Sequence, residues 1–474
     1  MDYEVVTMTR PKIGLLPMYA ELYDRAAPEK RPTAEAFLRQ ATGALEQRGL
    51  EVLTAPVCRL KGEFASAVKS FEDAGVDTIV TLHLTYSPSL ESSDVLAATR
   101  LPIIVLDTSP TYEFGPEQVP TEIFSNHGIH GVQDMCNLLI RNGKPFQIEA
   151  GHWEHSDVVD RVAGWARAAS IAARIRSARV GRIGKPFDGM GDFAIPTETL
   201  RSTIGIETIV CDSQVIRSLM PSEDDPEVEA EMAADRERFA ADGLDAEAHR
   251  RTVRTCLAVR RWIAKENLSA FTMNFMVIDK ASGLPVVPFL EASKAMARGI
   301  GYAGEGDIPT AALVSALASV HPDVTFTEIF CADWKGNRIF LSHMGELNLN
   351  LVAGKPQLME RPFPWTDAGN PVVALGRFRG GQAVLVNLAP GPDDTYTLIA
   401  APVEMIDVEG EDKMAGTVHG WFRPPMPIAD FLARYSRLGG THHSALVYGE
   451  VAEDVAKFGK LMGWNVVLLD RGQA

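Results

Sequence analysis

The sequence predicts an α/β protein with an N-terminal flavodoxin-like parallel α/β domain, a second α/β domain and a C-terminal antiparallel β-barrel-like domain. Apolar runs alternate with helical periodicity in the first part of the chain, and the same alternation returns in the middle. Short strands separated by turn residues then fill the last third. At 474 residues the chain is long enough for two or three well-buried cores. The expected domains are residues 1–177, 178–323 and 324–474.

Strands and helices alternate in the expected first domain. Continuous apolar strands of this kind are typical of a parallel sheet that is covered by helices on both faces, with ligand groups at the carboxyl ends of its strands. The expected strands are residues 12–17, 51–57, 76–82 and 101–106, and the expected helices are residues 33–48, 61–74 and 156–176. The last of these helices leads to the boundary with the second domain.

The second domain repeats the alternation, and the third domain replaces it with strands. In the second domain we expect strands at 178–184 and 269–275 and helices at 224–241, 246–266 and 289–298, with one more helix after Glu305. In the third domain we expect strands at 324–332, 338–342, 371–378, 381–388, 395–403 and 416–422, then a helix at 452–462 and a strand at 465–469. Short strands that alternate with turns predict an antiparallel barrel or sandwich.

Composition and charge exclude several kinds of partner. The formal net charge of −16 argues against nucleic acid and against an anionic membrane, since both require basic patches. The chain has no run of 18 apolar residues, and its first residues lack the apolar core of a secretory signal. Five cysteines form no CxxC pair, which is typical of reduced thiols. These features predict a cytoplasmic protein with a small-molecule substrate, no nucleic acid partner and no membrane partner.

Two glutamates and two histidines are candidate metal ligands. Glu305 lies in a glycine-rich turn before a helix, Glu328 lies in a strand, and His343 ends the next strand. His443, in the segment GGTHH, is the candidate for a fourth ligand. Carboxylate and imidazole ligands suit a Mn²⁺-like or Mg²⁺-like ion that also holds an oxygen-rich substrate. Because these residues are far apart in the sequence, their spacing alone leaves a metal site and ordinary structural roles equally open.

Each nearby polar residue also has a simpler interpretation. A lone Glu305 fits a carboxylate at a helix N-terminus, and Asp307 fits the N-cap of that helix. Glu346 is expected to be a charge at the exit of a strand. Neighbouring residues on a strand face opposite sides, so only one of His442 and His443 is expected to face a metal. His442 is then either a hydrogen-bond partner of the site or a substrate contact.

Four segments carry a resemblance to a known family. AGEGD, FTE-x-F, KGN followed by SHMGE, and GGTHH occur in this order and closely resemble the L-arabinose isomerase family, in the superfamily that also contains L-fucose isomerase. The resemblance implies that Glu305, Glu328, His343 and His443 hold a divalent ion, Mn²⁺ or another such as Mg²⁺ or Co²⁺. It also implies that Glu305 and Glu328 carry the proton transfers. In the absence of the ion, we expect repulsion between these two glutamates to raise one carboxyl pKa.

The resemblance further implies substrate contacts and an assembly. His130 matches a family histidine that contacts substrate from a neighbouring subunit, and His127 falls where the family has a glutamine. Met190 and Phe275 match apolar residues of the pocket. The expected substrate contacts are His130, His127, Met190, Phe275, His442 and Tyr19. The implied assembly is a closed homohexamer in which the first domain of one subunit covers the metal site of the next.

One segment departs from the family pattern. The family begins with a GSQHLYG-like segment, whereas residues 15–24 here read LLPMYAELYD and lack the glutamine. The leading hypothesis is a metal-dependent aldose–ketose isomerase that works through a cis-enediol on L-arabinose, D-galactose, L-fucose or a related aldose, an anionic 6-substituted aldose included. The alternative is a catalytically inactive sugar-binding or regulatory protein on the same fold.

Overall fold

A computed structural model describes residues 10–279 and 281–470 of the chain. The described residues divide into two compact units, the first ending at Ala173 and the second beginning at Arg174. Both predicted α/β regions and the predicted β-rich region are present, so the predicted fold class is confirmed. The second and third expected domains are parts of one compact unit.

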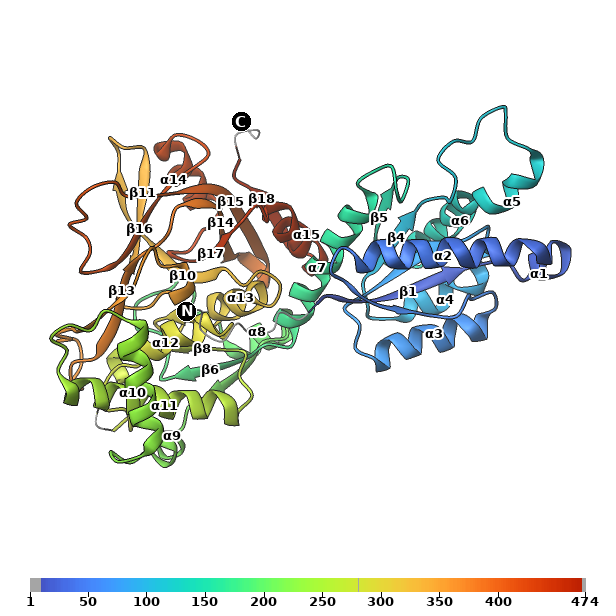
Figure 1. Cartoon of the computed structure of the whole chain (residues 1–474). Helices are drawn as coiled ribbons and strands as arrows, with labels where there is room; N and C mark the ends of the chain where they lie inside the picture. Colours follow the sequence, from blue (N-terminus) through green and yellow to red (C-terminus); the bar gives the residue numbers. More distant parts are fainter. Residues whose placement is uncertain (1–9, 280, 471–474) are drawn as a thin grey trace. The chain divides into compact units, whose positions relative to one another are not determined.

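The first unit is built on a five-stranded parallel sheet with the order β2-β1-β3-β4-β5 (Figure 1). This is the flavodoxin-like strand order, in which ligands bind at the carboxyl ends of the strands. Its strands are β1 (Lys12–Met18), β2 (Glu51–Thr54), β3 (Thr78–His83), β4 (Ile103–Asp107) and β5 (Phe146–Ala150). Its helices are α1 (Glu21–Ala26), α2 (Arg31–Glu46), α3 (Lys61–Asp73), α4 (Ser93–Ala98), α5 (Ile123–Asn126) and α6 (Gly128–Arg141), and α7 (Val158–Arg176) crosses the boundary.

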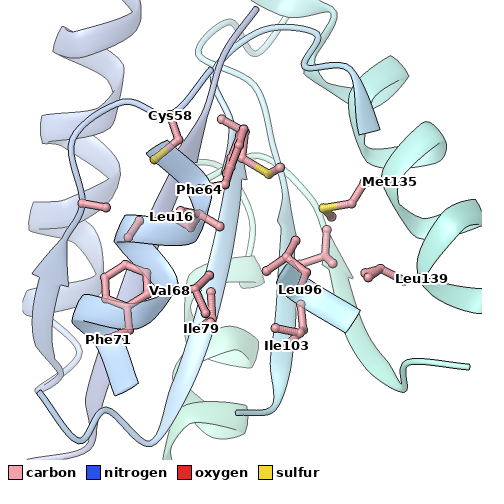
Figure 2. Close-up of a cluster of buried hydrophobic side chains, with 14 of the residues drawn as sticks. Leu16, Cys58, Phe64, Val68, Phe71, Ile79, Leu96, Ile103, Met135 and Leu139 are labelled. Atoms are coloured by element: carbon pink, nitrogen blue, oxygen red, sulfur yellow. The ribbon is translucent and has the colours of Figure 1, made fainter. Parts of the chain in front are cut away.

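An apolar cluster between the sheet and helices α3, α4 and α6 forms a core of the first unit (Figure 2). The cluster includes Leu16 of β1, Ile79 of β3, Phe71 of α3 and Leu139 of α6, all of them buried. Gly14 of β1 has no side chain where the ring of Phe71 packs, since a Cβ there would lie 2.5 Å from Phe71 Cγ. The uninterrupted apolar strands predicted from the sequence are therefore those that helices cover.

A four-stranded parallel sheet, in the order β7-β6-β8-β9, begins the second unit. Its strands are β6 (Arg179–Ile183), β7 (Glu207–Val210), β8 (Ala270–Met273) and β9 (Gly301–Gly304), and its helices are α8 (Thr197–Thr203), α9 (Ser213–Leu219), α10 (Pro226–Arg238), α11 (Ala246–Lys265), α12 (Phe289–Ala297) and α13 (Ile308–Ala318). The glycine-rich β9 was not expected as a strand. A Cβ at Gly301 would collide with the backbone of α13 at Ala311, so glycine allows strand and helix to pack closely.

The rest of the second unit is a nine-stranded sheet that closes on itself. Pairing of β16 with both β11 and β15 closes a ring of six antiparallel strands, β16-β11-β10-β17-β14-β15. Its strands are β10 (Val324–Asp333), β11 (Arg338–His343), β12 (Gln357–Glu360), β13 (Val372–Arg377), β14 (Gly381–Pro390), β15 (Tyr396–Ile406), β16 (Val418–Arg423), β17 (His443–Tyr448) and β18 (Asn465–Leu468), with helices α14 (Ile428–Arg437) and α15 (Ala452–Met462). This ring is the predicted antiparallel barrel.

Among the residues that the structure describes, we find no helix with the length and apolar content required to span a bilayer.

Candidate active site

Three adjacent barrel strands supply three of the predicted ligands. Glu328 lies on β10, His343 is the last residue of β11, and His443 is the first residue of β17. β10 lies between the other two strands, and Glu328 pairs across the ladder with Ser342 on one side and His443 on the other. Glu328 and His443, which are 115 positions apart in the sequence, are thus neighbours because their strands pair.

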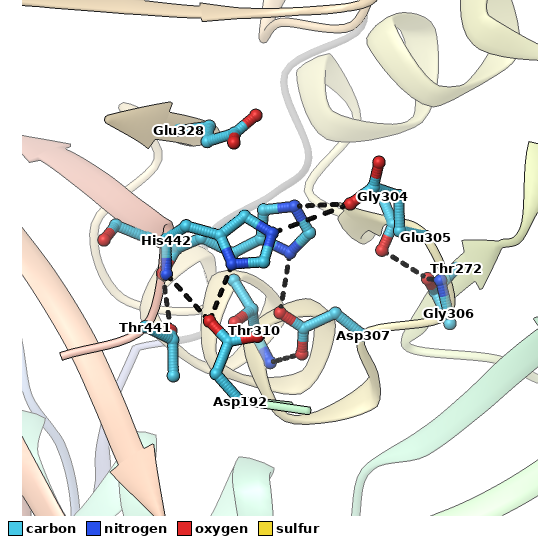
Figure 3. A network of polar contacts seen from close by, with 12 residues as sticks. Asp192, Thr272, Gly304, Glu305, Gly306, Asp307, Thr310, Glu328, Thr441 and His442 are labelled. Atoms are coloured by element: carbon cyan, nitrogen blue, oxygen red, sulfur yellow. Dashed lines mark hydrogen bonds and ion pairs between the residues drawn. The ribbon is translucent and has the colours of Figure 1, made fainter. Parts of the chain in front are cut away.

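The fourth predicted ligand comes from the parallel sheet. Glu305 occupies the turn between β9 and α13, and its φ of +63° lies in the left-handed region, which is uncommon for a residue other than glycine. Glu305 Oε2 lies 3.4 Å from His443 Nε2, and Glu328 Oε2 lies 3.9 Å from His343 Nε2. The structure therefore brings the four residues into one cluster, with His443 shared between the Glu305 side and the Glu328 side. Figure 3 shows Glu305 and Glu328 near His442.

His442 groups with Glu305 and His443, so the cluster contains three histidines. Each of them has a carboxylate on its Nδ1 atom. His343 Nδ1 lies 2.7 Å from Glu346 Oε2, His443 Nδ1 lies 2.9 Å from Asp307 Oδ2, and His442 Nδ1 lies 2.6 Å from Asp192 Oδ2. Such contacts fix the orientation and the tautomer of a histidine and leave its Nε2 for another ligand. In all three residues that Nε2 faces a glutamate of the cluster.

Asp307 has two functions in this arrangement. One carboxyl oxygen accepts a hydrogen bond from the backbone N–H of Thr310 at 2.9 Å, so Asp307 is the predicted N-cap of α13. The other oxygen contacts His443. The residue that fixes the start of α13 therefore also fixes a histidine of the barrel, and it links the two sheets at the site.

The expectation for Glu346 was wrong. Glu346 is only 1% exposed, and besides His343 it accepts a hydrogen bond from the hydroxyl of Tyr302 at 2.7 Å. The chain turns inward after β11 at Gly345, whose φ is +156°, and a Cβ there would lie 2.9 Å from Val373. A strand-exit glutamate is therefore carried into the interior, where only paired carboxylates are tolerated.

The expectation that His442 and His443 face opposite sides was also wrong. Strand β17 begins at His443, so His442 precedes the region of alternating side chains. The two ring centres lie 4.3 Å apart, and His442 Nε2 lies 3.7 Å from Glu305 Oε2. Both rings consequently face the same carboxylate, and His442 remains open to either of its expected roles.

The charges of the cluster shift its ionisation. Burial opposes the charged form of Glu305, but the neighbouring imidazoles of His442, His443 and His343 together outweigh it and lower its carboxyl pKa. The pKa of Glu328 is raised, mainly by burial, while the charge of Glu305 contributes least. One carboxyl pKa is thus raised as predicted, but repulsion is not the main cause. Burial lowers the pKa of His343, but the carboxylates of Glu346, Glu328 and Glu305 together outweigh burial and raise that pKa to about 9.

A buried nitrogen tests whether a divalent ion fits this cluster. The His443 side chain is fully buried, and its Nε2 has no hydrogen-bond partner among the described residues. A buried polar atom without a partner is costly unless something binds it. An imidazole nitrogen directed at carboxylates is a ligand set that Mn²⁺ accepts. The residues present therefore fit a divalent ion held by Glu305, Glu328, His343 and His443.

The predicted substrate contacts lie in both units. In the first unit, His130 is exposed and stacks on Tyr86 with ring centres 4.5 Å apart, and His127 Nε2 lies 2.8 Å from the hydroxyl of Tyr23. Tyr19 is buried, and its hydroxyl has no hydrogen-bond partner in the described part of the chain.

Met190 and Phe275 belong to the second unit. Met190 is half-buried in the segment between β6 and α8. Phe275 is buried, with its ring 5.5 Å from that of Phe187 and 5.6 Å from that of Phe363. The contacts of Phe275 are those of a core aromatic residue, and its predicted contact with substrate remains a prediction.

Two site residues were not found from the sequence. Asp192 lies in a loop two positions after Met190, and Tyr302 lies on the unexpected strand β9. The only signal for Asp192 is an acidic side chain close to Met190, which matches an apolar pocket residue of the family. Tyr302 gives no signal, because its partner Glu346 is 44 positions away.

Comparisons with known proteins match these segments. A family model for the L-arabinose isomerase central domain matches residues 217–322, and one for the L-arabinose isomerase C-terminal domain matches residues 323–465. The L-arabinose isomerase of Herpetosiphon aurantiacus is 24% identical over 441 residues, which are 89% of this chain and 86% of that protein. The chain belongs to the L-arabinose isomerase family. It is therefore an isomerase of the aldose–ketose, intramolecular oxidoreductase class.

Other relatives give the same extent of similarity. The L-arabinose isomerases of Acidothermus cellulolyticus and Geobacillus thermodenitrificans are each 25% identical, over 85% and 83% of this chain and 82% and 80% of their own lengths. Glu305 lies in the match to the central domain of the family, and Glu328, His343 and His443 lie in the match to its C-terminal domain. The resemblance predicted from four short segments is thereby confirmed.

Among solved structures, a periplasmic sugar-binding protein of an ABC transporter from Legionella pneumophila covers 66% of this chain and 93% of its own at 13% identity. Its TM-score of 0.17 is too low to inform either fold or function.

Proposed function

We propose that this member of the L-arabinose isomerase family is a divalent-metal-dependent aldose–ketose isomerase whose ion is held by Glu305, Glu328, His343 and His443. The single observation that carries the proposal is the buried His443 Nε2, which faces Glu305 and has no hydrogen-bond partner among the described residues. Mn²⁺ is the ion we favour, with Mg²⁺ or Co²⁺ as alternatives, because the donors are carboxylates and imidazoles.

The reaction moves a carbonyl group from C1 to C2 of a sugar through a cis-enediol. A proton leaves C2 and another arrives at C1, while a hydroxyl proton passes between the two oxygens. Glu305 groups with His442 and His443, and Glu328 groups with His343 and His443, so one carboxylate can act on the carbon-bound proton and the other on the hydroxyl proton. A bound ion would hold adjacent sugar oxygens and stabilise the negative charge of the enediolate.

The remaining residues keep these groups in place. Glu346, Asp307 and Asp192 orient the three imidazoles through Nδ1. His442, beside Glu305, is positioned to contact a sugar hydroxyl. We assign Met190 and Phe275 to the apolar wall of the sugar pocket on the basis of the family resemblance.

For the substrate we propose a class of sugars, the aldoses. Relatives named L-arabinose isomerase support an aldose such as L-arabinose, D-galactose or L-fucose. Residues 15–24 differ from the family pattern, and the positive residues Arg25, Lys30 and Arg31 follow. An anionic, 6-substituted aldose is therefore included among the candidates.

The assembly and the location are also proposed. We infer a homohexamer in which His127 and His130 of one subunit reach the metal site of a neighbour, because a second subunit can exclude water from an enediolate. We also infer a cytoplasmic location, which the five unpaired cysteines support.

A ketose-forming screen tests the proposal. The full-length protein, stripped with EDTA and reloaded with Mn²⁺, Mg²⁺ or Co²⁺, is incubated with pentoses, hexoses and acidic or sulfonated hexoses. We expect ketose from at least one aldose, with activity lost on stripping and restored by a divalent ion. Full activity in metal-free protein would contradict the metal site, and a metal-loaded protein that forms no ketose would contradict the isomerase function.

A further inference from the structure

The backbone at Glu305 is held in an unfavourable conformation by its surroundings. Glu305 has a φ of +63° and Gly306 a φ of +87°, so two consecutive residues lie in the left-handed region. Glycine adopts this region freely, but glutamate does so only when neighbouring contacts impose it. The turn therefore requires contacts that prevent Glu305 from relaxing.

A single buried hydroxyl supplies two of these contacts. Thr272 of β8 donates a hydrogen bond from its Oγ1 to the carbonyl oxygen of Gly304 at 3.2 Å. The same Oγ1 accepts a hydrogen bond from the backbone N–H of Gly306 at 3.0 Å. The hydroxyl thus bridges the residues on either side of Glu305, and Figure 3 shows Thr272 beside Gly306.

The location of Thr272 indicates that this contact is specific. β8 is buried along its whole length, and its other residues are Ala270, Phe271 and Met273. Thr272 is fully buried and pairs with Ala303 of β9, one residue before the turn. A buried hydroxyl costs free energy unless it is hydrogen-bonded, so a valine would be the simpler residue for this strand if packing were its only role.

The rest of the turn is fixed from other directions. The carbonyl oxygen of Glu305 accepts a hydrogen bond from the N–H of Phe187 at 2.9 Å. A Cβ on Gly306 would lie 2.7 Å from Pro186, and a Cβ on Gly304 would lie 2.7 Å from His343. The turn is therefore packed between the 185–187 segment and a cluster histidine, and a small change in its backbone would move the Glu305 carboxylate.

We propose that Thr272 is a positioning residue for catalysis: its hydroxyl clamps the Gly304–Gly306 turn and so holds the Glu305 carboxylate against His443. This inference rests on the proposed role of Glu305. Thr272 itself touches neither the cluster histidines nor the Glu305 side chain through any hydrogen bond found among the described residues. Its effect is therefore transmitted through the backbone of the turn.

The test compares Thr272→Val, which keeps the shape of the side chain but has no hydroxyl, with Thr272→Ser, which keeps the hydroxyl. Thr252→Val is the matched control, because Thr252 is also fully buried in the second unit and its hydroxyl accepts a backbone hydrogen bond, from Val372 at 3.0 Å. Each full-length variant is examined by Mn²⁺ titration calorimetry, by amide hydrogen exchange of the 301–313 segment and by kcat and KM with an aldose that the ketose screen identifies.

In Thr272→Val we expect the Gly306 amide to exchange faster and Mn²⁺ to bind about tenfold more weakly. We also expect kcat to fall roughly 10- to 100-fold with little change in KM, since small misplacements of a catalytic group have effects of this size. Thr272→Ser should restore all three values, and Thr252→Val should resemble the wild type. If Thr272→Val does not fold, Thr272→Cys replaces it, because a thiol is a weak hydrogen-bond donor.

Wild-type exchange and Mn²⁺ affinity in Thr272→Val would overturn the inference, even if no substrate had been identified. A Glu305→Gln variant separates this failure from a failure of the proposed function. Loss of turnover in Glu305→Gln with normal behaviour of Thr272→Val would reject only the clamp. Normal turnover in Glu305→Gln would reject the role of Glu305 itself.

Discussion

Two buried histidines, one in each unit, show how the surroundings decide what a histidine can do. His343 in the second unit is 8% exposed, and the Glu346 carboxylate lies beside its Nδ1. His83 in the first unit is 2% exposed, and neither of its nitrogens has a hydrogen-bond partner within the described residues. Burial lowers the pKa of His83 to about 3, whereas Glu346 and the two cluster glutamates together outweigh burial and raise the pKa of His343 to about 9.

The same contrast extends to the neighbouring residues. All three histidines of the cluster in the second unit have a carboxylate on Nδ1 and an Nε2 that faces a glutamate. In the first unit His127 contacts a tyrosine hydroxyl, and His130 is exposed. The second unit therefore holds a preorganised set of candidate ligands, while no carboxylate contact of His83, His127 or His130 is found among the described residues.

The largest effect should come from removing a carboxylate of the cluster. We expect Glu328→Gln and Glu305→Gln each to lose about 10²–10⁴ in turnover, because an amide cannot accept the proton. The assay is ketose formation in excess Mn²⁺. Glu409→Gln, at an exposed position, is the control and should be unaffected. Near wild-type activity in either cluster variant would remove that glutamate from its proposed role.

Removing the carboxylate that orients a cluster histidine should have a smaller effect, which is a loss of metal affinity. We expect Glu346→Gln to bind Mn²⁺ about 10- to 100-fold more weakly, since the amide no longer stabilises the orientation and basicity of His343. Calorimetric titration of metal-free protein measures this directly. Tyr302→Phe removes another hydrogen-bond partner of Glu346 and leaves His343 in contact, so it should weaken binding less. Equal affinities in Glu346→Gln and wild type would show that the contact does not support the site.

The sequence predicted those strands and site residues that depend on a local sequence pattern. Apolar runs predicted β1, β3 and β4, because these strands are covered by helices, and the Glu305, Glu328, His343 and His443 segments resembled a known family. The carboxylate partners were not predictable, since Asp192 meets His442 across 250 positions of sequence. The inward turn at Gly345 likewise depends on packing against Val373, which no local pattern encodes.

The pH dependence of stability tests whether burial keeps the His83 imidazole neutral. Its folded pKa of about 3 lies below the ordinary value of 6.5, so between these values the unfolded chain binds more protons than the folded one. Folding stability should then fall as the pH falls through this window. We expect the wild type to lose about 2 kcal/mol more than His83→Leu in the free energy of unfolding between pH 6.5 and pH 4.5.

Hydrogen exchange of the β3 amides in increasing denaturant reports this free energy for the first unit. Because His83 packs tightly against Gly131, the leucine variant can differ in absolute stability. The comparison therefore uses only the change with pH within each protein. The same pH response in both proteins would show that His83 is not held neutral by burial.

The last prediction concerns the role of His130, and whether it completes the metal site of a neighbouring subunit. If His130 reaches the metal site of a neighbouring subunit, defects in His130 and in Glu328 affect different chains of one site. His130→Ala and Glu328→Gln proteins, each inactive alone, should regain activity when they are unfolded and assembled together. Random mixing would leave about a quarter of the sites with both residues intact, so the regain should be partial.

A second mixture makes this result specific. Glu305→Gln with Glu328→Gln should regain nothing, because both residues belong to the same unit and every site would carry one defect. Mass measurement in solution shows whether the mixed chains assemble. Hybrids of normal mass that stay inactive would contradict a shared site, and so would a fully active monomer. Either result would confine the role of the first-unit histidines to their own chain.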